Sequence, residues 1–310
     1  MENVLVTGGA GFIGSHLAEA LVKQGCKVTV VDNLCEGRKK NLEAIAGKIK
    51  FVEADIRDRK KMLECTEDVN TIFHLAALKS VPASVENPKA YQDVNVNGTK
   101  VLLKAAAEKR VKKFVFSSSS SVYGDLPELP KKESMVPKPC SPYAETKLAG
   151  EQLLKEFSEK GINTISLRYF NVYGPKQNPN SKYAAVIPYF INAALLGKNI
   201  VIYGDGEQTR DFTYVGDVVN ANILAMDSAS SFNGAVVNIA GGKSISVNSL
   251  FETIQGSVNS SSKAVYEPER QGDVMHSLAD ISFAEKLLSW KPQTSLSRGL
   301  VKTIDFFKGD

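Results

Sequence analysis

Tyr143 and Lys147, in the run SPYAETK, are the two side chains whose types and spacing most directly suggest chemistry. The intervening residues allow a helix, and a separation of four residues puts both side chains on one helical face. A tyrosine has a reference pKa near ~10, but a neighbouring ammonium favours its phenolate form. The spacing alone also fits an ordinary amphipathic helix with a solvated lysine. As a functional pair, Tyr143 would be a general base and Lys147 its activator, drawing the Tyr143 pKa toward neutrality.

The N-terminal segment has the pattern of a dinucleotide-binding turn. Residues 3–7 (NVLVT) form a short apolar run typical of a buried parallel strand, and the next helix is predicted at 12–24. Between them, Gly8, Gly11 and Gly14 are spaced G-x-x-G-x-x-G. Such a turn lets backbone N–H groups approach a pyrophosphate at the N-terminus of a helix, where the helix dipole favours an anion.

Asp32 ends the second predicted strand, residues 27–32. An acid at this distance from the glycines accepts the ribose hydroxyls of the adenosine and repels a 2′-phosphate. The segment therefore predicts NAD rather than NADP as the cofactor.

A run of five serines, Ser117 to Ser121, follows another apolar strand and continues into Val122, Tyr123 and Gly124. In an open parallel sheet, ligands lie beyond the carboxyl ends of the strands. A serine-rich linker is the alternative, but the run is bounded by a core strand. These hydroxyls are therefore expected to face the cofactor site.

Apolar strand patterns alternate with helical patterns along most of the chain. Strands are predicted at 3–7, 27–32, 50–53, 70–74, 112–117, 163–168, 199–203 and 236–239, helices at 12–24, 58–66, 88–109, 142–160 and 186–197, and a basic loop at 36–41. This alternation predicts an α/β fold, a doubly wound parallel sheet of the Rossmann type with a smaller C-terminal substrate-binding lobe. The predicted cofactor domain comprises residues 1–170 and about 212–243, and the predicted lobe about 171–211 and 244–310.

Composition narrows the function classes. The chain has 310 residues, 43% of them hydrophobic, and 38 basic against 34 acidic side chains give a net charge of +4. We find no basic block interleaved with aromatics and no apolar stretch of membrane-spanning length, so neither nucleic acid nor a membrane is an expected partner. A core strand starting at Asn3 leaves no room for a signal peptide, which predicts a cytoplasmic protein. The four cysteines and three histidines show no metal-site spacing, and no metal is expected.

These motifs, together with others in the same order, resemble the extended short-chain dehydrogenase/reductases over nearly the whole chain. The further motifs are HLAALKSV (74–81), NVNGT (95–99) and LRYFNVYGP (167–175). Within that family the chain most resembles the UDP-hexose 4-epimerases, and above all those acting on UDP-N-acetylglucosamine, through KYAAVIP (182–188) and RQGDVMHSLAD (270–280).

The resemblance implies three sets of site residues. The catalytic set is Ser119, Tyr143 and Lys147. The NAD-binding set is Gly8, Gly11, Phe12, Ile13, Gly14, Asp32, Asn33, Asp55, Ile56, Leu75, Ala76, Ala77, Lys79, Asn95, Tyr143, Lys147 and Tyr169. The substrate-binding set is Lys79, Ser80, Ser119, Ser120, Ser121, Tyr143, Asn171, Val186, Ile187, Tyr203, Arg210, Arg270, Asp273 and Ser277.

The implied reaction is inversion at carbon 4 of a UDP-hexose through a transient 4-keto sugar. Related dehydratases carry an Asp-Glu pair where this chain has Ser120 and Ser121, which disfavours dehydration. UDP-glucuronate 4-epimerisation stays open, because Lys79 or the serines could bind a sugar carboxylate. A non-catalytic NAD-binding scaffold would typically lack the tyrosine or the lysine.

The resemblance also bears on substrate and assembly. A serine at position 277, where a tyrosine goes with rejection of an acetamido group, leaves space for N-acetylated sugars, with Ser80 as a neighbour of that group. Lys79 replaces a glycine expected in enzymes restricted to acetylated sugars, so activity on both UDP-GlcNAc/UDP-GalNAc and UDP-glucose/UDP-galactose is predicted. A homodimer through helices 88–109 and 142–160 is also implied.

Overall fold

A seven-stranded parallel sheet forms the larger part of the protein in the computed structural model, which describes residues 2–179, 185–269 and 274–309. The strand order is β11-β6-β5-β4-β1-β2-β3, and every neighbouring pair is parallel. The strands are β1 (Asn3–Thr7), β2 (Lys27–Asp32), β3 (Ile49–Glu53), β4 (Thr71–His74), β5 (Lys113–Ser119), β6 (Asn163–Tyr169) and β11 (Ala235–Ile239).

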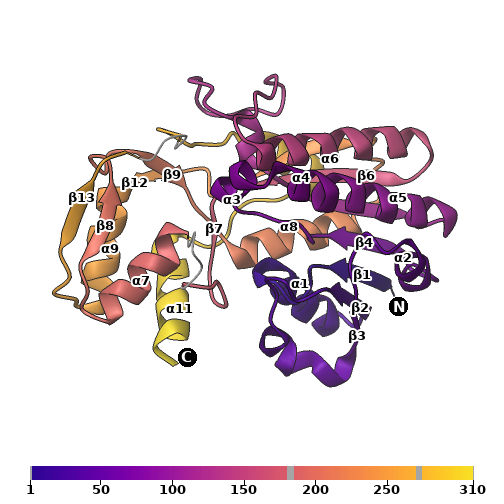
Figure 1. The fold of residues 1–310 in the computed structure, drawn as a ribbon, viewed down its shortest axis with the longest axis horizontal. Helices are drawn as coiled ribbons and strands as arrows, with labels where there is room; N and C mark the ends of the chain where they lie inside the picture. The colour runs from indigo at the N-terminus through magenta and orange to yellow at the C-terminus, as the bar shows by residue number, and fades with distance from the viewer. Residues whose placement is uncertain (1, 180–184, 270–273, 310) are drawn as a thin grey trace.

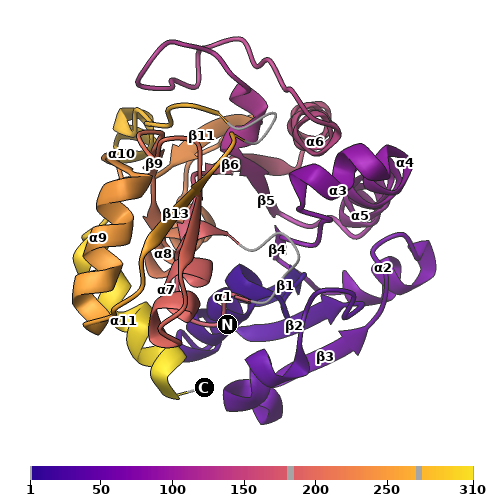
Figure 2. The ribbon, with the colours of Figure 1, turned by 60° about the vertical axis from the view of Figure 1, so that its left-hand side comes forward.

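The two faces of this sheet bury different side chains, because successive residues of a strand point to opposite sides. Val4 and Val6 pack in one cluster with α1 (Phe12–Lys23) and α8 (Val215–Asp227). Leu5 packs in the other, with α2 (Arg59–Cys65), α5 (Thr99–Glu108) and α6 (Pro142–Glu159). Helices therefore cover both faces, as Figure 2 shows, and the predicted doubly wound α/β fold is confirmed.

A second, smaller core lies beside the sheet, at the left of Figure 1. It joins α7 (Val186–Leu195), α9 (Val247–Val258) and α11 (Leu296–Gly309) to the parallel pair β8 (Ile200–Tyr203) and β13 (Ala264–Glu267). Two short pairs connect it to the sheet: β7 (Val172–Tyr173) with β10 (Thr213–Tyr214), and β9 (Thr209–Asp211) with β12 (Ser244–Ser246).

The predicted division into two domains stays a prediction. One C-terminal segment packs on the sheet rather than in the smaller core: α10 (Ser282–Leu288) and the fully buried Trp290 belong to the cluster of α1 and α8. The Trp290 indole also donates to the carbonyl of Asp217 at 3.0 Å. This segment of the predicted C-terminal lobe is thus packed into the core of the predicted cofactor domain.

The helix predicted over 88–109 is confirmed as a continuous helical segment over 88–108, with a π-helical middle part that was not predicted. This stretch forms α4 (Pro88–Tyr91), a π-helix η2 (Gln92–Gly98) and α5, and it is preceded by an unpredicted helix α3 (Val81–Glu86). The break at Asn87 follows from local chemistry, because its side chain accepts from Ala90 N at 3.3 Å and Pro88 begins the next helix. The basic loop predicted at 36–41 runs into a 3-10 helix, η1 (Lys39–Lys48), and η3 (Ser120–Tyr123) follows β5.

Candidate active site

The turn after β1 brings backbone atoms too close together for side chains. Gly8 has φ +68°, and a Cβ on it would lie 2.7 Å from Ala76 N. A Cβ on Gly14 would lie 2.3 Å from the Gly8 carbonyl oxygen. Among the described residues no side chain caps α1 at Gly11, and the first N–H groups of a helix, here those of Phe12 and Ile13, have no intrahelical acceptor. The turn therefore fits the pyrophosphate of a dinucleotide.

Asp32 lies at the end of β2, beside this turn. Its carboxylate accepts from Ala10 N at 3.0 Å and from Leu34 N at 2.8 Å. Burial raises the pKa of this carboxyl, against the lowering effect of the two backbone N–H groups. An ionised carboxylate has about four acceptor positions. One of them binds the glycine turn at Ala10 and one binds Leu34 in the loop after β2, so two can accept ribose hydroxyls.

Asn33 and Asp55 meet at the ends of β2 and β3. The Asn33 amide donates to Asp55 at 3.1 Å, and Arg57 donates to both oxygens of Asp55 through Nε at 2.9 Å and Nη2 at 2.7 Å. Arg57 also donates to Asp93 at 2.6 Å. The Arg57 hydrogen bonds hold the Asp55 pKa down at about 2. Sequence reasoning missed Arg57, although it follows the predicted pair Asp55 and Ile56 directly.

Asn95 fastens the loop after β4. Its amide oxygen accepts from Leu78 N at 2.8 Å, while its nitrogen donates to Leu78 O at 2.9 Å and to the Thr146 hydroxyl on α6 at 3.0 Å. The half-buried Leu75, Ala76 and Ala77 belong to this loop. Asn95 thereby ties the loop beside the glycine turn to the helix that carries Tyr143.

Lys79 and Ser80, at the end of the same loop, are engaged by protein groups. The exposed Lys79 ammonium lies 2.9 Å from a carboxylate oxygen of Glu36, in the loop after β2. The Ser80 hydroxyl accepts from Ala83 N at 3.2 Å and so caps α3. Their predicted contacts with cofactor and substrate stay predictions.

His74 is a buried residue of this region that sequence reasoning did not single out, although it begins the HLAALKSV motif. Its ring contacts the hydroxyl of Thr7 at 2.7 Å and that of Thr99 at 2.8 Å. Because Thr99 donates to Asn95 O at 2.6 Å, it accepts from His74 Nε2. Burial, with a smaller contribution from Lys147, lowers the His74 pKa to about 3, so the ring is a neutral link between β1, β4 and α5.

Ser119, Tyr143 and Lys147 lie together at the carboxyl end of β5. The Lys147 ammonium donates to the carbonyl of Ser117 at 2.6 Å and lies 5.9 Å from the centre of the Tyr143 ring. The Ser119 hydroxyl accepts from both N–H and Oγ of Ser121, at 3.2 and 2.9 Å. Ser119 also interacts with the side chain of Tyr143, whose pKa it acts to lower.

Burial, rather than the neighbouring ammonium, dominates the ionisation of this cluster. It raises the Tyr143 pKa to about 12, although the Ser119 hydrogen bond acts in the opposite direction. It lowers the Lys147 pKa to about 8, against the effect of the Glu151 carboxylate. In the chain alone the loss of solvation thus dominates the Tyr143 pKa, and the activation of Tyr143 by Lys147 stays a prediction.

Tyr169 and the remaining serines lie close to this cluster. Tyr169 is the neighbour of Ser119 in the β5–β6 ladder, but its hydroxyl exchanges hydrogen bonds with Asn222 at 2.8 and 3.1 Å. Burial raises its pKa, and the side chain is part of the core. Ser120 is half-buried at the start of η3, and Ser121 donates to Ser119. A cofactor contact of Tyr169 stays a prediction.

Asn171 and Ser277 meet on the side of the site nearer the smaller core. The Asn171 backbone is left-handed, with φ 32°, and its amide donates to Asp211 O at 2.9 Å and to the Ser277 hydroxyl at 3.5 Å. Arg210, between Asp211 and Thr209, donates to the carbonyls of Thr209 and Met275 at 3.0 and 3.2 Å. Two predicted substrate residues far apart in sequence thus share one contact.

The other predicted substrate residues divide into three groups. Ile187 is fully buried in the smaller core, where its side chain packs against protein. Val186 and Tyr203 are half-buried, at the start of α7 and the end of β8. Arg270 and Asp273 lie outside the described residues.

Asp211 is a second residue that sequence reasoning missed. It is fully buried, and its Oδ2 accepts from Ala279 N at 3.1 Å and from Gly242 N at 3.2 Å. Its Oδ1 is buried without a partner among the described residues. Burial raises the Asp211 pKa to about 7, so this carboxyl titrates near neutrality. The sequence feature that could have identified Asp211 is its position directly after Arg210, a predicted substrate residue.

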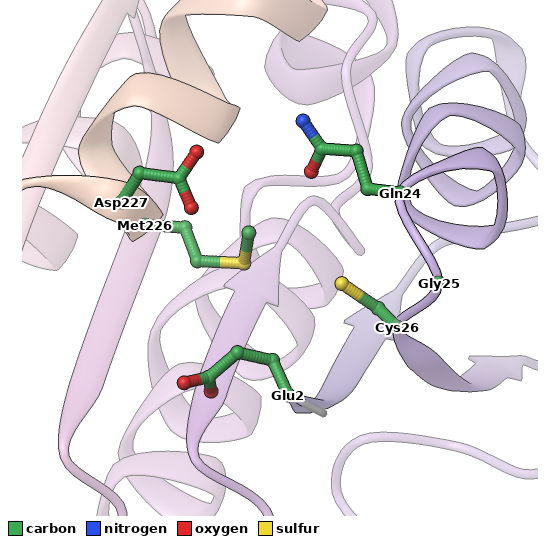
Figure 3. A pocket seen from close by; sticks show the side chains of 6 residues that line it. All are labelled: Glu2, Gln24, Gly25, Cys26, Met226 and Asp227. Atoms are coloured by element: carbon green, nitrogen blue, oxygen red, sulfur yellow. The ribbon is translucent and has the colours of Figure 1, made fainter.

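A cavity of about 450 Å³ lies at the opposite edge of the sheet, where the strands begin. Figure 3 shows its lining residues, which are Glu2, Gln24, Gly25, Cys26, Met226 and Asp227. It contains none of the predicted site residues. The candidate active site instead comprises the glycine turn and the hydroxyl cluster at the carboxyl ends of the strands.

The model of the NAD dependent epimerase/dehydratase family matches residues 4–240, which include the glycine turn and the Ser119, Tyr143 and Lys147 cluster. The chain belongs to this family. NAD is its cofactor, in agreement with the fit of the turn and Asp32 to a dinucleotide.

Relatives within the NAD dependent epimerase/dehydratase family span the whole chain. A UDP-N-acetylglucosamine 4-epimerase from Methanobrevibacter ruminantium M1, solved in complex with UDP-N-acetylmuramic acid, is 44% identical, with a TM-score of 0.94 and coverage of 99% of this chain and 98% of that one. A UDP-glucose 4-epimerase of Mycolicibacterium smegmatis is 40% identical, over 98% of each chain. A UDP-N-acetyl-alpha-D-glucosaminuronate decarboxylase of Bacillus cytotoxicus is 37% identical, over 99% of this chain and 98% of that one.

Proposed function

We propose that this enzyme is a UDP-hexose 4-epimerase, which interconverts UDP-GlcNAc with UDP-GalNAc and UDP-glucose with UDP-galactose. The observation that carries the proposal is the cluster of Ser119, Tyr143 and Lys147 at the same sheet edge as the glycine turn. An ionisable oxygen, a hydrogen-bond donor and a cation lie together there, which supports a reaction between a sugar oxygen and a bound cofactor.

In this proposal Tyr143 removes the proton from the sugar 4-hydroxyl, while Ser119 donates to the same oxygen. Bound NAD would supply the hydride acceptor and donor that the oxidation and re-reduction of carbon 4 require, and the glycine turn and Asp32 would hold it. Lys147 binds the nicotinamide ribose and, as an ammonium, favours the phenolate of Tyr143. Tyr143 then gives the proton back, so the net redox change is zero.

The ionisation of Lys147 gives the proposed reaction an alkaline limit. Its pKa is lowered to about 8, so its ammonium is present below that value and lost as pH rises through it. Turnover that depends on this charge is expected to fall above about pH 8, well before an ordinary lysine would titrate.

The contact between Asn171 and Ser277 supports the substrate part of the proposal. Asn171 belongs to the motif expected to meet the sugar, and the Ser277 hydroxyl is 3.5 Å from its amide nitrogen. A side chain as small as serine beside a sugar-binding amide leaves room for an acetamido group. Because Lys79 is not the glycine of strictly acetyl-selective enzymes, we propose activity on both pairs of sugars.

UDP-glucuronate 4-epimerisation is the second candidate function. The decarboxylase relative acts on a uronic acid by its name, and the hydroxyls of Ser119, Ser120 and Ser121 could bind a carboxylate. A non-catalytic scaffold has no support from the site, because tyrosine and lysine are both present and in contact with their expected neighbours.

The decisive experiment incubates the protein with NAD and, separately, UDP-glucose, UDP-galactose, their N-acetylated counterparts and UDP-glucuronate, and then separates the products. Inversion of both hexose pairs supports the proposal. Turnover of UDP-glucuronate alone would replace it with the second candidate, and no inversion of any sugar would contradict both.

We further propose that the protein is a cytoplasmic homodimer that pairs through η2, α5 and α6. In the part of the chain that the structure describes, no helix is long and apolar enough to cross a membrane. Exposed positions of α5 and α6 include Lys100, Lys104, Lys155 and Glu156, and none of the exposed large apolar side chains in the described residues lies on these helices. A dimer through this face would be polar and would weaken at high salt, which sedimentation at two ionic strengths can measure.

A further inference from the structure

One buried acid lies directly behind the proposed catalytic cluster. Glu151 is one helical turn beyond Lys147 on α6 and is 5% exposed. Its Oε1 accepts from the Ser118 hydroxyl at 2.5 Å and from Arg168 Nε at 2.8 Å, and its Oε2 accepts from Arg168 Nη2 at 2.7 Å. Three donors from two strands thus converge on a single carboxylate of the helix.

The sheet presents these donors side by side. Ser118 of β5 and Arg168 of β6 are partners in the parallel ladder, so their side chains leave the same face of the sheet. The Arg168 guanidinium is 2% exposed and lies 4.6 Å from the centre of the Tyr123 ring, whose hydroxyl donates to Asn238 at 2.7 Å. The bidentate geometry and this support define the position of Glu151 closely.

The same face of β5 also contacts α6 at Gly150, the residue before Glu151. Phe116, two residues before Ser118, lies so close to Gly150 that a Cβ there would be 2.4 Å from its ring. Gly150 and Glu151 therefore fix both the separation and the register of α6 on β5. The Lys147 contact with Ser117 O and the Tyr143 contact with Ser119 depend on that register, because they join the same helix to the next residues of the same strand.

We propose that Glu151 is a positioning residue, whose carboxylate anchors α6 across β5 and β6 and so holds Tyr143 and Lys147 at the end of β5. It acts through these residues and has no role of its own in the chemistry. The inference rests on the proposed function for the roles of Tyr143 and Lys147.

The Glu151 carboxylate also affects the ionisation of Lys147. Other groups surround the Lys147 ammonium as well. These are the neutral His74 from β4, Tyr143 from the same helix, and Arg168 from β6 behind Glu151. Glu151 raises the pKa of Lys147, whereas burial lowers it. The charge of Lys147 in turn lowers the pKa of His74. Removal of the Glu151 charge should therefore move the loss of the ammonium to lower pH.

The first test is the variant Glu151→Gln, which keeps size and an acceptor oxygen but removes the charge. The Lys147 Cε signal in a carbon NMR titration, assigned by its absence in Lys147→Met, should titrate at lower pH than in the unmodified protein. The kcat for UDP-hexose inversion should fall about 10- to 100-fold, because misplacement of reacting groups by about 1 Å costs rates of that order. KM should change little, and the alkaline limb of the kcat profile should move to lower pH.

Glu151→Gln leaves the Arg168 charge buried without a counter-charge, which can prevent folding. The second variant therefore combines Glu151→Leu with Arg168→Met, since replacement of both partners of a buried ion pair by apolar groups is often neutral for stability. It should fold and still be slow. Glu19→Gln, which breaks the partly buried ion pair of Glu19 with Lys176, is the matched control and should leave kcat and the Lys147 titration unchanged.

An unshifted Lys147 titration in Glu151→Gln, or a folded double variant with kcat within about twofold of the unmodified protein, would overturn the proposal. A shifted titration in a protein that inverts no UDP-sugar would instead refute the proposed function and leave the effect of the Glu151 charge on Lys147 intact.

Discussion

Substitution of Gly14 by alanine should disable the cofactor turn while the rest of the fold persists. The added Cβ would lie 2.3 Å from the Gly8 carbonyl oxygen and 2.8 Å from Gly9 Cα, both of them backbone atoms that cannot rotate away. Ordinary contact begins at 3.4 Å, so the distance to the oxygen must grow from 2.3 to 3.4 Å, a shift of about 1.1 Å in the turn or the helix. Overpacking of this kind destabilises a protein by about 1–3 kcal/mol.

The assay separates the effect on binding from the effect on stability. Isothermal titration with NAD should show a loss of affinity of at least about tenfold, because a displacement of about 1 Å removes the alignment of the first N–H groups of α1. Chemical denaturation should show the loss of unfolding free energy. The control is Gly256→Ala, in α9, where a Cβ would meet nothing within 4 Å and alanine should stabilise the helix by about 0.5–1 kcal/mol. Unchanged NAD affinity in Gly14→Ala would refute the reasoning.

Three further substitutions test the site, and a fourth tests a buried carboxyl. Tyr143→Phe should lose about 10²- to 10⁴-fold in kcat and keep its NAD affinity, and retention of more than about a tenth of the rate would exclude Tyr143 as the base. Asp32→Ala should weaken NAD and reduce discrimination against NADP in binding titrations; equal binding of both by the unmodified protein would contradict the assignment. Ser277→Tyr should abolish turnover of the acetylated sugars and spare the plain hexoses, whereas a parallel loss of both would show that Ser277 is not the gate. The Asp211 pKa is raised from 3.8 to about 7, so its ionisation destabilises the fold as pH rises through that window; Asp211→Asn should flatten this part of the stability–pH curve, and an identical curve would refute the assignment.

Local patterns were enough for most of the sheet and for the cofactor turn. Strands such as β1 and β2 are apolar runs that have few alternatives to burial, and the spacing of Gly8, Gly11 and Gly14 reflects steric demands within one turn. The continuous helical pattern of 88–109 also predicted the helical segment 88–108, but not its π-helical part, where Asn95 bonds to the backbone of Leu78, a distant segment. No local pattern contains that contact.

The sequence by itself determined the order of the elements, the NAD-binding turn, and the residues that could form a tyrosine, lysine and serine cluster. Only the tertiary structure decided how these groups ionise and what holds them, because both depend on neighbours far along the chain. Burial raises the Tyr143 pKa where spacing alone suggested that Lys147 would lower it. The position of Glu151 depends on Ser118 and Arg168, which are fifty residues apart in sequence but are partners in adjacent strands. Solvation and strand register are properties of the packed molecule, and neither can be read from spacing along the chain.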